Sequence, residues 1–189
     1  MRALKAVSAM LIALVTLSGG HAWADDAASS LYKLELQLTD QSSRAQQIDL
    51  YSGQPTLVTM FYGSCPMACP LLIDTLRAVE NALAPEERAR VRVLMVSIDP
   101  ERDAPQALAA LAKQRRIDLQ RWTLARADAD DVRMLAAALN TQYRRLPNGE
   151  YNHTSVITLL GRDGQMLKQT STVGRADPEL MAAIRAELR

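Results

Sequence analysis

The sequence predicts a single α/β domain in which a central mixed β-sheet is flanked by helices. The predicted elements run strand, helix, strand, two helices, a hairpin of strands and a last helix, which is the order of such domains. At 189 residues and 48% hydrophobic content the chain suits one domain with a sizeable core. Other α/β folds fit this order too. The position of Cys65 and Cys69, where the first buried strand meets a helix, favours a thioredoxin-like arrangement.

The predicted domain, residues 31–189, begins with a β-hairpin that extends the sheet. Leucines alternate with polar residues over 31–38, which is typical of a half-buried strand. Residues 39–44 are turn-like, and residues 47–51 are expected to pair back onto the first strand.

Apolar runs and helical stripes follow one another through the rest of the chain. The continuous apolar runs 57–62 and 91–98 suit strands covered on both faces. An apolar stripe at helical spacing predicts a helix over 70–83. The other predicted elements are a helix from about residue 105, a short strand at 122–124, a helix capped by Asp128, a polar loop at 144–151, paired strands at 154–160 and 166–172, and a helix from residue 177.

The first 24 residues have the layout of a secretory signal peptide. Arg2 and Lys5 precede an apolar run over 6–17, and Ala22-Trp23-Ala24 matches a cleavage site. The alternative is an uncleaved membrane anchor, although the run is short for a membrane span. We therefore expect a periplasmic protein, with contact to the membrane only through an uncleaved N-terminal segment.

Cleavage after Ala24 changes the charge and the set of metal-binding residues. The mature chain loses two of its 22 basic residues and none of its 21 acidic ones, so its net charge is −1. This charge gives no reason to expect a nucleic acid partner. Since His21 is also lost, His153 becomes the sole histidine beside the two cysteines.

The spacing of Cys65 and Cys69 leaves three interpretations open. Four residues apart, their side chains share a face in a helical turn, which allows a disulfide, a redox couple or two sulfur ligands for one metal ion. A purely structural disulfide is the weakest of these, since closing so short a loop stabilises little. A helix N-terminus favours the thiolate form that redox chemistry and metal binding both need.

His153 extends the metal interpretation. In a thioredoxin-type topology the loop before the last hairpin lies near the cysteines, so we expect His153 to approach both sulfurs. A lone histidine is otherwise most often a solvated or core residue. Two thiolates and an imidazole suit copper, because sulfur favours Cu(I) and nitrogen helps to hold Cu(II); zinc is a chemical alternative.

The sequence resembles the Sco/SenC family of copper-binding, thioredoxin-like proteins, which act in assembly of the copper centre of cytochrome c oxidase. The resemblance covers about residues 36–189. It rests on Leu38-Thr39-Asp40-Gln41, Cys65-Pro66-Met67-Ala68-Cys69-Pro70, the segment 96–105 (VSIDPERDAP), and His153-Thr154 with Asp163-Gly164. It implies that Cys65, Cys69 and His153 are copper ligands, with copper ion as the cofactor.

The sequence departs from the usual family pattern around the expected ligands. Gly63-Ser64 stands where the family usually has Thr-His, Met67 where an acidic residue is common, and Asn152 where Asp usually precedes the histidine. These differences remove negative charge near the site and leave the three ligands in place. Asp99 and Asp103 allow two interpretations, a strand end and helix cap or a supporting role beside the ligands.

Three functions are compatible with these residues. The first is a periplasmic metallochaperone that passes copper to a cytochrome c oxidase subunit or another periplasmic copper protein. The second is a thiol–disulfide oxidoreductase, in which Cys65 and Cys69 are the catalytic pair and His153 tunes a thiol pKa. A peroxidase-like enzyme is the third, and no sequence feature marks a peroxidatic cysteine.

Overall fold

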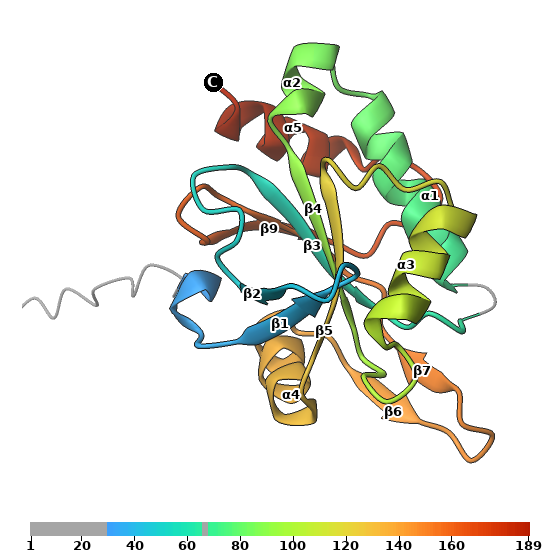
Figure 1. Ribbon diagram of the computed structural model, residues 1–189. Helices are drawn as coiled ribbons and strands as arrows, with labels where there is room; N and C mark the ends of the chain where they lie inside the picture. Colours follow the sequence, from blue (N-terminus) through green and yellow to red (C-terminus); the bar gives the residue numbers. More distant parts are fainter. Residues whose placement is uncertain (1–29, 66–67) are drawn as a thin grey trace, which may run out of the picture.

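The computed structural model describes residues 30–65 and 68–189. Two β-sheets are formed within these ranges (Figure 1). The strands are β1 (Gln37–Asp40), β2 (Ala45–Gln47), β3 (Thr56–Phe61), β4 (Arg92–Ser97), β5 (Trp122–Ala127), β6 (Tyr143–Arg145), β7 (Tyr151–His153), β8 (Ile157–Leu160) and β9 (Met166–Thr170). The helices are the 3₁₀ turn η1 (Leu31–Lys33), α1 (Ala68–Asn81), α2 (Pro85–Ala89), α3 (Pro105–Gln114), α4 (Ala129–Ala138) and α5 (Pro178–Glu187).

The larger sheet is mixed, as predicted. In the described part of the chain it has seven strands in the order β2-β1-β5-β4-β3-β8-β9. β3, β4 and β5 run parallel, while β1 and β8 pair antiparallel to β5 and β3. The helices α1 and α3 lie on the same side of this sheet (Figure 1), because both belong to right-handed crossovers that run in the same direction across it.

β3 lies inside the sheet, between β4 and β8, and leads to the cysteines. All six of its side chains are buried, which confirms the prediction of a strand covered on both faces. It pairs with β4 in register, so that Phe61 lies opposite Ser97 at the carboxyl ends of the two strands. The residues that follow β3 and those that follow β4 are therefore brought together at one edge of the sheet.

The N-terminal hairpin is present but shifted from its predicted position. Residues 31–33 form the turn η1, because Leu31 N donates to Gly164 O and ties this segment to the β8–β9 turn. Ser43 has a φ of +62°, which lets the chain reverse before Ala45. The return strand is thus β2, two residues earlier than predicted, and residues 48–51 belong to a turn.

The prediction of a polar loop over 144–151 holds for residues 146–150 and is wrong at its two ends. Residues 143–145 and 151–153 pair as the antiparallel strands β6 and β7, with Tyr143 opposite His153. The two strands form a small sheet of their own, outside the seven-stranded one. The next strand, β8, begins at Ile157, three residues later than predicted, and His153 is the last residue of β7.

The helices agree with the periodicity of the sequence, apart from details at their ends. The short helix α2 was not predicted. α4 begins after Asp128 as expected, although the Asp128 side chain makes no capping hydrogen bond. α5 is capped by Asp177, whose carboxylate accepts hydrogen bonds from Glu179 N and Leu180 N.

The predicted signal peptide, residues 1–24, lies outside the described residues. Within the described ranges, none of the helices is both long enough and apolar enough to cross a membrane.

Candidate metal site

The two cysteines lie in the connection from β3 to α1. Cys65 N donates to Tyr62 O at 3.2 Å, which forms a tight turn directly after β3. Cys69 lies in the first turn of α1, and its N–H donates to Cys65 Sγ at 3.4 Å. An N–H group directed at a sulfur stabilises negative charge there, as expected at a helix N-terminus.

The Cys69 thiol is the more deeply enclosed of the two. Cys69 is 2% exposed and Cys65 is 8% exposed, and no disulfide joins them. The Cys69 thiol donates to Tyr62 O at 3.0 Å, while Tyr62 N donates to Cys69 Sγ at 3.5 Å. Burial raises the pKa of the Cys69 thiol well above its usual value, so in the absence of a metal this group is protonated.

His153 is oriented with one ring nitrogen available to a ligand. Its Nδ1 lies 3.2 Å from Thr154 O, and a hydrogen bond there places the ring proton on Nδ1. Nε2 is buried and has no hydrogen-bond partner among the described residues. Burial lowers the pKa of the imidazole, which favours the neutral form that metal binding requires.

The structure brings the three sequence-predicted residues together. One ligand atom from each of Cys65, Cys69 and His153 lies within 4.8 Å of the other two. A bound ion would give the orphaned Nε2 a partner and would lower the proton affinity of both thiols. Two sulfurs and one imidazole nitrogen suit a soft or borderline ion such as copper or zinc.

Asp103 holds the loop that carries Cys65. Its Oδ2 accepts hydrogen bonds from Gly63 N at 2.8 Å and from the hydroxyl of Ser97, at the end of β4. The cap residue of α3 is Ala104, so the interpretation of Asp103 as a helix cap is wrong. Burial raises the pKa of the Asp103 carboxyl, and its hydrogen bonds to Ser97 and Gly63 oppose this effect.

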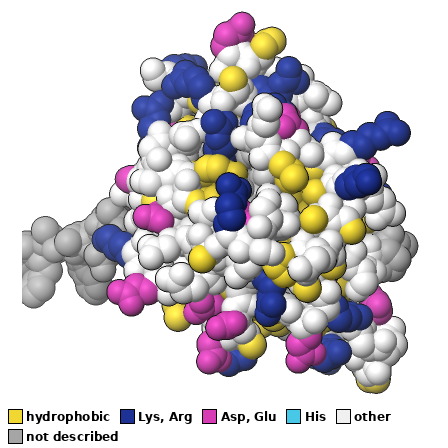
Figure 2. Space-filling model, viewed as in Figure 1, with side chains coloured by type: hydrophobic (Ala, Val, Ile, Leu, Met, Phe, Trp, Pro, Cys, Tyr) yellow, Lys and Arg dark blue, Asp and Glu magenta, His cyan; other side chains and the backbone are white. Residues whose placement is uncertain are grey.

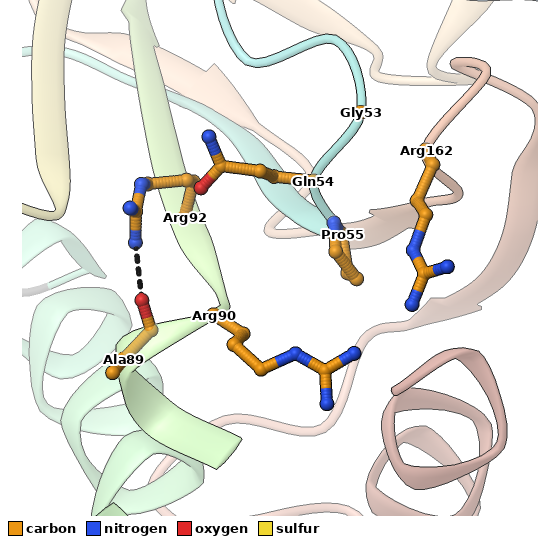
Figure 3. A pocket seen from close by; sticks show the side chains of 7 residues that line it. All are labelled: Gly53, Gln54, Pro55, Ala89, Arg90, Arg92 and Arg162. Carbon is orange, nitrogen blue, oxygen red and sulfur yellow. Dashed lines mark hydrogen bonds between the residues drawn. The ribbon is translucent and has the colours of Figure 1, made fainter. Parts of the chain in front are cut away.

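Two cavities help to delimit the site. One of about 370 Å³ is lined by His153 and its neighbours Gln142, Tyr143, Arg144, Asn152 and Thr154, so the imidazole borders an open hollow. Another, of about 440 Å³, is lined by Arg90, Arg92 and Arg162 with Gly53, Gln54, Pro55 and Ala89 (Figure 3). It lies at the amino ends of β3 and β4, whereas the cysteines follow the carboxyl end of β3, and its lining offers none of the expected metal ligands.

The face drawn in Figure 2 has no large patch of a single sign of charge. Lys and Arg side chains are spread over this face and alternate with Asp and Glu side chains along its lower edge.

Sequence reasoning did not single out two side chains near the site, Tyr62 and Arg102. Tyr62 was counted only as the last apolar residue of the strand, although its place three residues before Cys65 is a usable signal. Arg102 lies between Asp99 and Asp103, so its place in an acidic segment could have suggested an ion pair.

Comparison with known proteins relates the whole described domain to one family. The family model SCO1/SenC matches residues 24–189. The mitochondrial SCO1 homolog of Homo sapiens is 29% identical over 145 residues, which are 74% of this chain and 47% of that protein. A relative from Stutzerimonas stutzeri is 24% identical over 136 residues, 70% of this chain and 65% of that protein. The chain thus spans about half to two thirds of the length of these relatives.

Solved structures show the same fold. The copper-bound structure of ScoI from Bradyrhizobium japonicum has a TM-score of 0.64 and 26% identity, covering 80% of this chain and 96% of that chain. BsSco, described as having a disulfide switch and as a member of the Sco family of cytochrome c oxidase assembly proteins, has a TM-score of 0.67 and 21% identity, covering 84% of this chain and 95% of that chain. The thioredoxin-like fold predicted from the sequence is confirmed.

Proposed function

The chain belongs to the SCO1/SenC family, and from this membership we propose that it is a copper-binding accessory protein for cytochrome c oxidase. In this role it delivers copper to the copper centre of the oxidase or prepares that centre to receive it. The observation that carries the proposal is the convergence of Cys65, Cys69 and His153 within 4.8 Å. The copper bound by the relative from Bradyrhizobium japonicum supports the choice of metal.

Cys65, Cys69 and His153 would hold the copper ion. The two sulfurs satisfy Cu(I), and the imidazole nitrogen adds a donor that Cu(II) prefers. Copper in this site is cargo, and it would leave by exchanging these ligands one at a time for those of the receiving protein. The cavity beside His153 gives such a protein access to the imidazole side of the site.

Export completes the proposal. Residues 1–24 are assigned as a signal peptide that directs the chain to the periplasm, where disulfides can form and where the copper protein that receives the metal would be met. A retained N-terminal segment would instead tether the domain to the membrane.

A copper titration tests the proposed function. The reduced protein is titrated anaerobically with Cu(I) and, separately, with CuCl₂, and we expect one equivalent of each to bind. His153→Ala should abolish stable Cu(II) binding and leave Cu(I) binding through the two sulfurs. Asn152→Ala, an exposed neighbour on the same strand, is the matched control and should bind both ions. The absence of stoichiometric copper binding by the wild type would rule out this function.

A thiol–disulfide oxidoreductase is the second candidate, favoured by the two adjacent thiols that no disulfide joins. The dithiol would give two electrons and two protons to a partner's disulfide, ending as a Cys65–Cys69 disulfide while the partner ends as a dithiol. Exchange with a disulfide-bonded partner peptide at defined glutathione potentials tests this step. If the protein is an oxidoreductase, His153→Ala should keep the exchange activity. If it is a copper-binding protein, the same variant should lose Cu(II) binding.

A further inference from the structure

The hairpin that carries His153 is attached to the domain differently from the strand that carries the cysteines. Among the described residues, its strands β6 and β7 pair with each other alone and form no backbone pairing with the seven-stranded sheet. The position of His153 relative to the two sulfurs therefore depends on side-chain contacts between the hairpin and the body of the domain.

Arg102 makes several of these contacts from the segment between β4 and α3. Its Nη2 donates to Gly149 O, at the tip of the hairpin, at 2.7 Å. Its Nη1 lies 4.0 Å from Glu150 Oε1, and its guanidinium carbon lies 5.9 Å from the centre of the Tyr151 ring. One guanidinium thus contacts three consecutive residues that lead into β7, by a hydrogen bond, an ion pair and a cation–π contact.

A buried carboxylate fixes Arg102 itself. Arg102 Nε donates to Asp99 Oδ2, and the Asp99 side chain is only 1% exposed, while that of Arg102 is 36% exposed. Asp99 N in turn donates to the Ser97 hydroxyl at 2.9 Å, at the end of β4. The guanidinium is therefore anchored to the central sheet at one end and faces the hairpin at the other.

The contacts continue from the hairpin to the cysteines. The single proton of the Tyr62 hydroxyl is shared between Glu150 Oε2, at 3.0 Å, and Tyr151 O, at 3.3 Å. The backbone of Tyr62 exchanges hydrogen bonds with Cys69 Sγ. Arg102 and Tyr62 thus both connect the hairpin that carries His153 to the part of the domain that carries the two cysteines.

We propose that Arg102 is a positioning residue that keeps His153 within bonding distance of a metal held by Cys65 and Cys69. This inference rests on the proposed function, since it concerns the same site. Without the guanidinium, the hairpin separates from the body and the site keeps its two sulfurs but loses its nitrogen. Such a site still satisfies Cu(I), whereas Cu(II) loses the ligand that it prefers.

The main test compares three variants of the full chain. Arg102→Lys keeps a positive charge for Asp99 but cannot make the forked contact with Gly149 and Glu150. This variant therefore isolates that forked contact, which we call the clamp. Arg102→Ala removes both the positive charge and the forked contact. Arg145→Ala is the matched control, because Arg145 also joins the hairpin to the same segment, through an exposed ion pair with Glu101 at 3.2 Å. Exposed ion pairs of this kind contribute little to stability.

The first measurement is copper binding by the reduced protein. For Arg102→Ala we expect Cu(II) affinity to fall by about 10- to 100-fold, as for other residues that orient a metal ligand. The absorption and EPR spectra of the remaining Cu(II) complex should lose the signature of the nitrogen ligand. The Cu(I) affinity of Arg102→Ala should stay close to the wild-type value. The Cu(II) affinity of Arg102→Lys should lie between those of the wild type and Arg102→Ala, and that of Arg145→Ala should equal the wild-type value. Unchanged Cu(II) spectra in both Arg102 variants would overturn the proposal.

The second measurement uses the metal-free protein, so that it remains valid even if the chain binds no copper. Hydrogen exchange is followed at the amides of Leu146 and Gly149, which are bonded within the hairpin tip. Faster exchange there in Arg102→Lys, with unchanged exchange in β3 and β4, is the expected result. Equal exchange in the wild type and both Arg102 variants contradicts the clamp, whereas uniformly faster exchange throughout the domain assigns Arg102 a purely structural role.

Discussion

The ring of Tyr62 stands edge-on to the imidazole of His153, with 5.6 Å between the ring centres and an angle of 77° between the planes. Tyr62 comes from the end of β3 and His153 from the end of β7, so this contact joins two elements that share no backbone pairing. The same tyrosine ring lies 5.4 Å from that of Tyr151. Tyr62 is thus the side chain through which the cysteine strand and the histidine hairpin touch.

Replacing Tyr62 with Phe should weaken this junction without opening a cavity. The ring contacts remain, while the hydroxyl bonds to Glu150 and to Tyr151 O are lost. One proton shared between two acceptors at a buried side chain predicts a loss of about 1 kcal/mol in the free energy of unfolding. Urea denaturation measures this loss, and Tyr143→Phe, on the β6–β7 hairpin that Tyr62 contacts, is the control. Equal stability of Tyr62→Phe and the wild type would show that the hydroxyl is satisfied equally well by water.

Gly63 should not tolerate even one added methyl group. A Cβ at this position would lie 2.6 Å from Asp103 Oδ1, so the carboxylate that holds the loop would have to move. We expect Gly63→Ala to cost about 1–3 kcal/mol of stability, as in other overpacked sites. Ser64→Ala, at the exposed neighbouring position, should change stability by less than about 0.5 kcal/mol. Thermal unfolding of the two variants gives the comparison, and similar midpoints would contradict the close packing.

The sequence predicts the centre of the fold better than its periphery, for physical reasons. β3 and β4 are covered on both faces, so their apolar runs are continuous and mark them clearly. The hairpin of β6 and β7 lacks such a run, because it packs through tyrosine rings and one arginine instead of an apolar face. A pattern of apolar residues cannot report contacts of this kind, and the segment therefore resembles a polar loop.

The candidate site shows the same division. Cys65 and Cys69 could be placed from the sequence because they directly follow a recognisable buried strand. The approach of His153 was expected from topology, but its tautomer depends on the carbonyl of Thr154, a backbone contact that residue types do not encode. The sequence leaves two interpretations of Asp103, a helix cap or a supporting role beside the ligands, because a carboxylate just before Pro105 resembles a cap. Its hydrogen-bond partners come from β4 and the cysteine loop instead of from α3.

The stability of the metal-free protein should depend on pH through His153. Burial lowers the pKa of its imidazole below the ordinary value of 6.5, so the unfolded chain binds this proton more readily than the folded one. The unfolding free energy should therefore be highest above pH 6.5 and fall as the pH decreases from 6.5 toward the lowered folded-state value. Denaturation at a series of pH values should show this slope in the wild type and a reduced slope in His153→Ala. His21, the other histidine in the sequence, is common to both proteins and cancels in the comparison.

The two thiols should react at different rates, and the structure indicates the order. Cys69 is held protonated by burial, and its thiol donates to Tyr62 O. Cys65 is somewhat more exposed, and its sulfur accepts the N–H of Cys69, an arrangement that favours a thiolate. Since the thiolate is the nucleophile, Cys65 should be the attacking cysteine in disulfide exchange and the first to be alkylated.

Single-cysteine variants measure this order directly. With iodoacetamide at pH 7.5, the Cys65 thiol in Cys69→Ser should be alkylated faster than the Cys69 thiol in Cys65→Ser, because the thiolate is the reactive form. Labelling both variants in denaturant should abolish the difference, because it arises from the fold and not from the neighbouring residues in sequence. A faster reaction at Cys69 in the folded protein would instead mean that the hydrogen bond to Tyr62 O opens readily, and it would reverse the assignment of attacking and resolving cysteines.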